Sequence, residues 1–361
     1  MDMKLCPKCF ASVEAAGYAC SAPHCSRAGI PVPPAAEQEE GAAPLCPACQ
    51  SRMTVKVCLE CGFELDPDAL QRGLLCFSLV GDQGVGKSNF LGVLIRELAR
   101  EFCRVYGATL YPTGGDRTMD RYQRIYSRPL YDLGVCVPPT EREDVDPLTY
   151  TLLFSGNSAA GHTCSLAFYD SFGKNFESEA NMALYNRSIY HSAGILLLVD
   201  PAQFPAIREQ RSARGLPLTP GDPQELLLRT IHLLRAGLGL ASVEQKIPVP
   251  LAVCVTKMDT LFHQLDPASF VRDPSRSLRQ PALSEADLSS CSMEMESLLE
   301  VWGAGELLRH VKSQFQDWCF FGLSALGNSP GEQGEIPRIS PHRVLDPLLW
   351  LLWRNQILKA E

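Results

Sequence analysis

Residues 81–88 read GDQGVGKS, which places three glycines, a lysine and a serine at a spacing suited to phosphate. In the pattern G-x-x-x-x-G-K-S/T, backbone N–H groups surround the phosphates, the lysine reaches the β and γ oxygens, and the hydroxyl binds Mg²⁺. We therefore expect Lys87 to act on the γ-phosphate and Ser88 to ligate magnesium. The nucleotide-binding residues expected in this loop are Gly81, Asp82, Gln83, Gly84, Val85, Gly86, Lys87, Ser88 and Asn89.

The segments on either side of this loop have the patterns of a strand and a helix. Residues 74–80, LLCFSLV, form an apolar run typical of a buried strand. Residues 88–102, SNFLGVLIRELAREF, have apolar side chains at helical spacing. A strand that enters a glycine-rich loop and leaves it as a helix is the context in which such a loop binds phosphate.

A later strand ends in an acid that suits the metal of a bound nucleotide. Residues 164–173, CSLAFYDSFG, form an apolar strand that ends at Asp170 and is followed by Gly173. An acid at a strand tip can hold Mg²⁺ through water, and a glycine N–H can meet the γ-phosphate. Residues 193–201, AGILLLVDP, predict one more fully buried strand.

The last two predicted strands carry residues that can recognise a base. Residues 247–259, IPVPLAVCVTKMD, end in Thr256, Lys257 and Asp259. A carboxylate accepts the two donor N–H groups on one edge of guanine, which adenine lacks, while the lysine stem packs over the ring. Residues 318–327, WCFFGLSALG, bring Ser324 and Ala325 to a suitable place for a backbone contact with the guanine oxygen. The sequence therefore favours GTP over ATP.

These motifs occur in one order, each at the carboxyl end of a predicted strand, where ligands bind in an open α/β sheet. From residue 75 to about 355 the chain resembles the Ras-like GTPases of the translation-factor-related class. The resemblance implies a P-loop NTPase fold, a three-layer α/β/α arrangement around a mostly parallel sheet, and a switch that binds GTP or GDP with Mg²⁺. The long insertions and the cysteine-rich head resemble, more loosely, the bacterial double-GTPase group, which implies a role in a defence or conflict system.

The resemblance also implies a threonine that ligates Mg²⁺ and acts on GTP, between the first helix and the second strand. We predict Thr140 for this role, with Thr113 and Thr118 as alternatives. The same interval has helical periodicity with four arginines on or near one face. These arginines have two interpretations: they lie on a solvated helix face, or one acts as an arginine finger within the chain. They are Arg117, Arg121, Arg124 and Arg128.

The residue after Gly173 is Lys174, where Ras-like enzymes often have a glutamine that orients water. An ammonium group has no acceptor for a hydrogen bond from that water. We therefore expect hydrolysis of GTP to GDP and phosphate to be slow, unless a partner, a dimer, or a residue such as Glu177 or Arg121 assists.

Eight cysteines in the first 61 residues occur as four closely spaced pairs. Four thiolates match the tetrahedral preference of Zn²⁺, and nothing in the N-terminal sequence indicates export to an oxidising compartment that would favour disulfides. Taken in sequence order, the pairs predict two zinc ribbons, at 1–28 and 45–66, with linkers at 29–44 and 67–74 and the GTPase domain at 75–361. The ligand sets of this prediction are Cys6, Cys9, Cys20 and Cys25, with His24 as an alternative to Cys25, and Cys46, Cys49, Cys58 and Cys61.

The remaining composition indicates a globular protein with large insertions, near 202–246 and 261–300. The net charge of −8 argues against nucleic acid as the main partner, and the sequence has no apolar run long enough to span a membrane. We expect a cytoplasmic protein whose switch loops or zinc ribbons contact a protein partner. Two other function classes stay open, namely a scaffold that binds guanine nucleotide without hydrolysing it and a nucleic-acid-binding protein that uses GTP.

Overall fold

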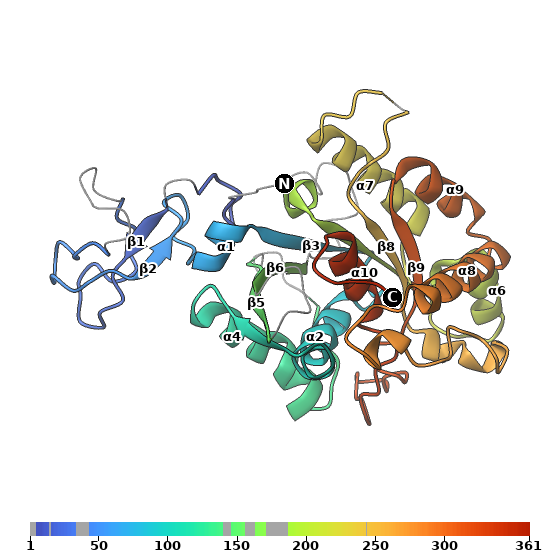
Figure 1. Cartoon of the computed structure of the whole chain (residues 1–361). Helices are drawn as coiled ribbons and strands as arrows, with labels where there is room; N and C mark the ends of the chain where they lie inside the picture. The colour runs from blue at the N-terminus through green and yellow to red at the C-terminus, as the bar shows by residue number, and fades with distance from the viewer. Residues whose placement is uncertain are drawn as a thin grey trace.

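The computed structural model describes residues 5–13, 16–33, 43–139, 146–155, 163–170, 187–242 and 244–361. Within these ranges a sheet of seven strands, in the order β4-β5-β6-β3-β7-β8-β9, forms the centre of the molecule (Figure 1). Its strands are β3 (Leu74–Val80), β4 (Ala108–Pro112), β5 (Leu148–Phe154), β6 (Thr163–Asp170), β7 (Gly194–Val199), β8 (Leu251–Val255) and β9 (Trp318–Gly322). Neighbouring strands are parallel except that β5 is antiparallel to both β4 and β6. The predicted mostly parallel P-loop fold is confirmed.

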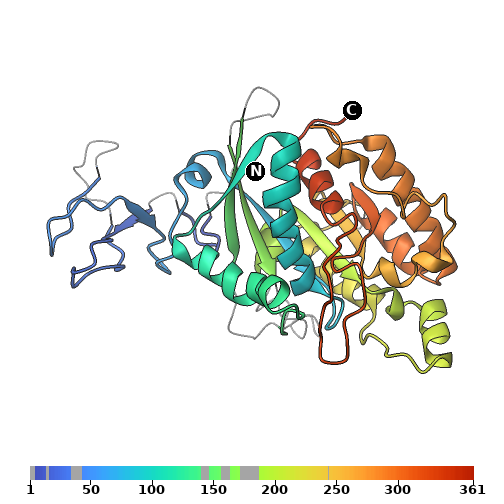
Figure 2. The same cartoon turned by 90° about the horizontal axis from the view of Figure 1, so that it is seen from below.

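Helices cover both faces of this sheet, as three layers require (Figures 1 and 2). One apolar core lies between the sheet and the helices α2, η1, η2 and α10, and a second lies between the sheet and η4, α7 and α9. The bounds on the first face are α2 (Lys87–Glu97), η1 (Leu98–Phe102), α3 (Cys103–Tyr106), α4 (Asp116–Arg121), η2 (Tyr122–Asp132) and α10 (Asp346–Arg354). The helices on the second face and beside β9 are η4 (Arg187–His191), α6 (Pro205–Ala213), α7 (Pro223–Gly237), α8 (Glu285–Val301) and α9 (Gly305–Gln314).

Strand β3 illustrates why the central strands contain continuous apolar runs. Phe77 and Leu79 pack into the first core, whereas Val80 packs into the second, and all three side chains are fully buried. Side chains alternate between the faces of a strand, and helices cover both faces of a parallel sheet, so no face of β3 meets water.

The C-terminal segment packs against the sheet. Helix α10 buries Leu348, Leu349 and Trp350 against β8 and β9, while Trp353 is only partly covered. In the insertion near 202–246, helix α7 buries Leu227 and Leu234 in the second core. Among the described helices, none combines the length and apolar character that crossing a membrane requires.

The cysteine-rich head is a single interleaved unit. Its strands β1 (Gly17–Ala19) and β2 (Val55–Val57) pair antiparallel, with Tyr18 opposite Lys56. In such a pair the chain before β1 lies beside the chain after β2, and the chain after β1 lies beside the chain before β2. The sulfur groups are therefore Cys6, Cys9, Cys58 and Cys61, and Cys20, Cys25, Cys46 and Cys49.

All eight predicted cysteines lie in the two groups, but the predicted grouping was wrong. The sets Cys6, Cys9, Cys20 and Cys25 and Cys46, Cys49, Cys58 and Cys61 assumed that each zinc is completed by the next pair along the chain. Strand pairing instead joins the first pair to the last and the second pair to the third. His24, the predicted alternative to Cys25, is exposed. Cys25 itself belongs to the second sulfur group.

The head contacts the sheet through the turn of its first cysteine pair (Figure 1). Tyr169 donates its hydroxyl to the carbonyl of Pro7 at 2.7 Å, and Lys8 forms an ion pair with Asp146 at 2.8 Å. Phe10 stacks on His191 with ring centroids 4.9 Å apart. After β2, helix α1 (Pro67–Arg72) leads into β3.

Candidate functional site

The phosphate loop folds as its glycines predict, between β3 and α2. Gly84 and Gly86 have φ values of +85° and +94°, which side chains other than glycine rarely tolerate. A Cβ at Gly81 would lie 2.8 Å from the carbonyl oxygen of Leu198, so this position has no room for a side chain. Helix α2 begins at Lys87, and its N-terminal N–H groups therefore face the loop.

Lys87, the first residue of α2, extends its side chain back to the loop and is 7% exposed. Its ammonium donates to the carbonyl oxygens of Gly81 at 2.6 Å and Asp82 at 2.8 Å. Burial lowers the pKa of Lys87 to about 8. A phosphate oxygen would stabilise the charged form of this buried amine, so the arrangement suits an anion.

Asp170, at the end of β6, is buried beside the start of α2. Its carboxylate accepts a hydrogen bond of 3.1 Å from the hydroxyl of Tyr126. Burial raises the pKa of Asp170, and the nearby hydroxyl of Ser88 opposes this shift. A hydroxyl and a carboxylate that meet at a phosphate loop fit Mg²⁺, which prefers oxygen ligands.

The candidate base-binding residues lie at the same edge of the sheet. Thr256 donates its hydroxyl to the carbonyl of Val85 at 2.9 Å, which attaches the end of β8 to the phosphate loop. Asp259 accepts a hydrogen bond of 2.5 Å from the hydroxyl of Ser324, and Ala325 follows Ser324. Lys257 has a φ of +54° and donates to the carbonyl of Gly84 at 2.7 Å.

A cleft of about 400 Å³ joins these elements, a volume in the range of small-molecule sites. It brings together nine of the residues predicted to bind nucleotide: Gly84, Val85, Gly86, Asn89, Thr256, Lys257, Asp259, Ser324 and Ala325. The predicted residues Gly81, Asp82, Lys87 and Asp170 are not among those that line the cleft. The predicted residues Thr140 and Gly173, and also Lys174 and Glu177, lie outside the described residues.

Three residues of the cleft region were missed by sequence reasoning. Asp200 accepts from Lys257 at 2.5 Å and from Thr219 at 2.6 Å, and it is 4% exposed. Gln203 donates to the carboxylate of Asp82 at 2.8 Å. Asp200 could have been predicted from the sequence, because it directly follows a buried strand at the edge of the sheet where ligands bind. Thr219 lies in an insertion that only the folded chain brings to the loop.

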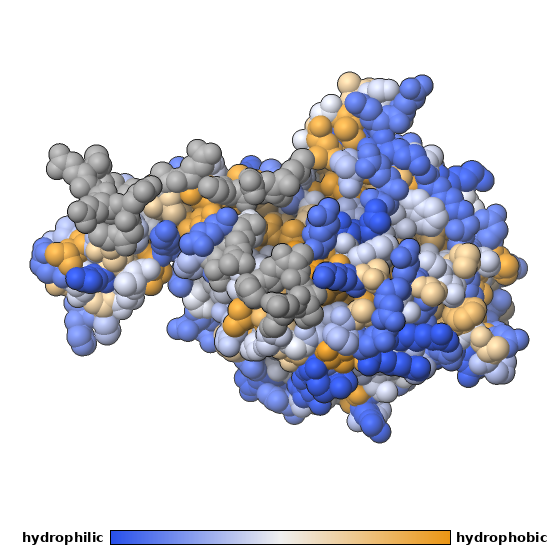
Figure 3. Space-filling view, viewed as in Figure 1, coloured by the Kyte–Doolittle hydropathy of each residue, from blue (hydrophilic) through white to orange (hydrophobic). Residues whose placement is uncertain are grey.

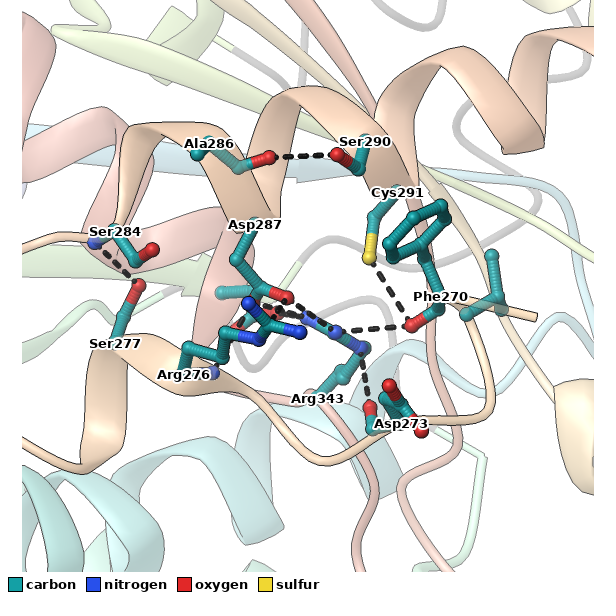
Figure 4. Close-up of polar contacts among 12 residues, drawn as sticks. Phe270, Asp273, Arg276, Ser277, Ser284, Ala286, Asp287, Ser290, Cys291 and Arg343 are labelled. Atoms are coloured by element: carbon teal, nitrogen blue, oxygen red, sulfur yellow. Dashed lines mark hydrogen bonds and ion pairs between the residues drawn. The ribbon is translucent and has the colours of Figure 1, made fainter. Parts of the chain in front are cut away.

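A buried ion network around Arg343 (Figure 4) lies next to the segment that carries Ser324 and Ala325. Ser324 and His342 exchange backbone hydrogen bonds of 3.0 and 2.8 Å, which closes the loop after β9. The next residue, Arg343, has a φ of +51° and contacts the carboxylates of Asp287 at 3.0 Å and Asp346 at 2.6 Å. Arg343 also donates to the carbonyl of Phe270 at 3.0 Å. The base loop is thus anchored to both α8 and α10.

The two alternative threonines lie away from the cleft. Thr118 is buried, and its hydroxyl lies 3.1 Å from that of Thr149. The backbone N–H of Thr113 donates to the carbonyl of Thr149 at 2.8 Å. Both are attached to β5, and neither lines the cleft just described.

The four arginines do not share one environment. Arg117, Arg124 and Arg128 are exposed, as the solvated-face interpretation expects. Arg121 is 8% exposed and lies beside Tyr126 and Asp170, whose pKa values respond to its charge.

The sulfur groups of the head have the geometry of zinc sites. Sγ–Sγ distances are 3.6 Å for Cys6–Cys61 and Cys9–Cys58, and 3.5 Å for Cys20–Cys49 and Cys25–Cys46. A tetrahedron with Zn–S bonds of about 2.3 Å has edges of about 3.8 Å, whereas a disulfide bond is only about 2.05 Å long. The donors therefore fit Zn²⁺ in both groups.

Comparison with known proteins gives one relative of moderate similarity. No known family profile matches the chain. It is 28% identical over 323 residues to SaeC from Mycolicibacterium smegmatis, described as a candidate ESX-1 scaffolding and assembly protein. The alignment covers 82% of this chain and 79% of that protein.

Two solved GTPase structures align with the chain at low scores. A signal recognition particle receptor SRb-GTP/SRX complex from Chaetomium thermophilum gives a TM-score of 0.33 at 13% identity, covering 72% of this chain and 94% of that chain. The small GTPase Arl6 BBS3 from Trypanosoma brucei, with bound GppNp, gives a TM-score of 0.33 at 12% identity. The alignment covers 78% of this chain and 99% of that chain. The fold assignment therefore depends on the chain's own strand order and phosphate loop.

Proposed function

We propose that this chain is a guanine-nucleotide-binding switch protein with a two-zinc head. The observation that carries the proposal is the cleft, which joins the phosphate loop to Asp259 and Ser324 at one edge of the sheet. Asp259 offers the carboxylate that guanine requires, and Lys257 reaches from the same turn to the phosphate loop. The residues that would hold Mg²⁺ are Ser88 and Asp170, with Thr140 as the predicted third. The metal would neutralise phosphate charge.

Base choice is the direct test. Asp259→Asn reverses the donor and acceptor pattern that meets the base, so GTP affinity should fall at least tenfold while xanthosine triphosphate affinity rises. The size follows from loss of a charged hydrogen-bond pair, roughly 1.5–3 kcal/mol. Titration with fluorescent nucleotides and competition by GTP, ATP and xanthosine triphosphate measures both effects. Preference of the unaltered protein for ATP would refute the guanine assignment.

Slow hydrolysis of GTP belongs to the same proposal and remains a prediction. Its main argument is Lys174, which lies outside the described residues. A non-hydrolysing scaffold is the second candidate function, and the similarity to a protein described as a scaffolding and assembly protein favours it. Single-turnover assays separate the two, because a scaffold would leave bound GTP intact over many hours whereas a slow switch would convert it.

The head supports a protein partner in either case. Its two zinc sites take up cysteine thiolates that only a reducing compartment preserves, which favours a cytoplasmic location. On the face drawn in Figure 3, apolar side chains form small separate groups rather than one large patch. We infer a partner in protein-complex assembly, by analogy with the relative, and retain the translation-factor-related and double-GTPase resemblances as finer proposals.

A further inference from the structure

The hydroxyl of Tyr126 reaches Asp170 from a part of the chain that carries no recognised motif. Tyr126 lies in η2, is 1% exposed, and donates its hydroxyl to Asp170 Oδ2 at 3.1 Å. Burial and the nearby Asp170 charge raise the pKa of Tyr126 well above its ordinary value, so the phenol stays protonated and remains a donor.

Asp170 lies between the start of α2 and η2. Tyr126 donates to it from η2, and the hydroxyl of Ser88 lies close enough to lower the pKa of the carboxyl. Arg121, one turn before Tyr126, is buried, and its charge lies near both the phenol and the carboxylate. The phenol therefore fixes the orientation of the carboxylate through Oδ2.

Tyr126 is itself held firmly. Its ring stacks on Tyr122 at a centroid distance of 6.2 Å, and a Cβ at Gly92 of α2 would lie 3.1 Å from Tyr126 Cβ. A glycine in the middle of α2 therefore lets η2 approach closely enough for the phenol to reach Asp170. A helix interior normally disfavours glycine by about 1 kcal/mol relative to alanine, so Gly92 has a packing reason.

We propose that Tyr126 is a positioning residue for Asp170, whose hydroxyl holds the carboxylate in the orientation that serves the Mg²⁺ of a bound nucleotide. The inference rests on the proposed function, because that function supplies the metal. Groups that orient a metal-binding side chain typically change metal affinity by roughly 10- to 100-fold when they are removed. Tyr126→Phe removes the donor and keeps the ring.

Tyr122→Phe is the matched control. Tyr122 lies in the same helix, and its hydroxyl also donates to a single oxygen, the carbonyl of Gly92, at 3.1 Å. Each variant removes one phenol donor from η2, but only Tyr126 contacts Asp170. Thermal unfolding of both variants measures how much each change costs the fold, independently of nucleotide.

The experiment compares GTP affinity in Mg²⁺ with GTP affinity in EDTA. Tyr126→Phe should reduce the ratio of the two affinities about tenfold, and Tyr122→Phe should leave it within about twofold of the unaltered protein. An unchanged ratio in Tyr126→Phe, or an equal loss in both variants, overturns the inference. No GTP binding by the unaltered protein in either buffer would instead refute the proposed function.

Asp170→Asn gives a second test that does not depend on the stability of one variant. If Tyr126 acts through the carboxylate, adding Tyr126→Phe to Asp170→Asn should not lower the affinity ratio further. A further tenfold loss in the double variant would show that Tyr126 acts through the packing of η2, and it would overturn the inference.

Discussion

Two double cysteine variants test the interleaved zinc sites directly. Cys6→Ser with Cys61→Ser removes two ligands from a single sulfur group, whereas Cys6→Ser with Cys20→Ser removes one ligand from each group. A sequential arrangement reverses these assignments, because it places Cys6 with Cys20 and away from Cys61. Each variant lacks two thiols, so total cysteine content is matched and only the grouping differs.

The expected effect follows from the energy of a structural zinc site. Such sites contribute about 10–16 kcal/mol at neutral pH, or roughly 2.5–4 kcal/mol for each of four thiolates. Loss of two ligands from one site therefore costs roughly 5–8 kcal/mol, about 10⁴- to 10⁶-fold in affinity. Loss of one ligand from each of two sites weakens both by roughly 10²- to 10³-fold.

Metal analysis with chelator competition distinguishes the outcomes. Cys6→Ser with Cys61→Ser should retain one zinc ion at full affinity and lose the other. Cys6→Ser with Cys20→Ser should show two ions that a chelator removes more easily than in the unaltered protein. The opposite pattern would refute the pairing of β1 with β2 as the organiser of the head. Absence of zinc from freshly purified protein would refute both arrangements.

Two further predictions concern the cleft. Leu218, which lines it, and Leu216, which does not, are 44% and 43% exposed, so they form a matched pair. Leu218→Ala should weaken nucleotide binding by about 1 kcal/mol, roughly fivefold, whereas Leu216→Ala should leave it unchanged. Titration with fluorescent GTP measures both effects. Equal effects would exclude Leu218 from the binding surface. Because the pKa of Lys87 is lowered to about 8, its charge is progressively lost above that pH, so binding that needs the ammonium should weaken by up to about tenfold per pH unit from 8 to 9. Affinity that stays constant between pH 7 and 9 would contradict this.

The phosphate loop and the base-binding residues could be predicted because their signals are local. Gly86, Lys87 and Ser88 adopt their positions within one strand–loop–helix unit, and Asp259 follows its strand by four residues. Parallel strands then bring such segments to the same edge of the sheet. Short stretches of chain therefore contain most of the information that places the cleft.

The zinc grouping could not be predicted because it depends on a distant pairing. The sequence shows four cysteine pairs of similar spacing, and each can join any other to complete four ligands. The pairing of β1 with β2, in which Gly17 lies opposite Val57, determines which cysteine pairs meet. Both strands are only three residues long. Such short strands have no hydrophobic pattern strong enough to indicate their partner.

The arginine helix shows a different limit. Periodicity placed Arg117, Arg121, Arg124 and Arg128 on or near one face, which assumes α-helical turns throughout. The chain instead changes to π-helical turns at Tyr122, so residues on either side of that point no longer share a face. Arg124 and Arg128, beyond that point, are exposed, whereas Arg121 is buried; Arg117, at the start of α4, is also exposed. Turns of this kind occur frequently at functional sites, which agrees with the position of Tyr126.

The helical segment from Asp116 to Asp132 connects the zinc head to the candidate magnesium site. Just before it, Gly114 and Gly115 lie close to Phe63 and Glu64, two and three residues after the last cysteine of the head, and both glycines have positive φ. Further along, Tyr126 contacts Asp170. These contacts form a contiguous, close-packed path between Asp170 and the head. For the nucleotide switch proposed above, this contiguous path would link Asp170 to the candidate zinc sites, and a partner bound to the head would then alter nucleotide affinity.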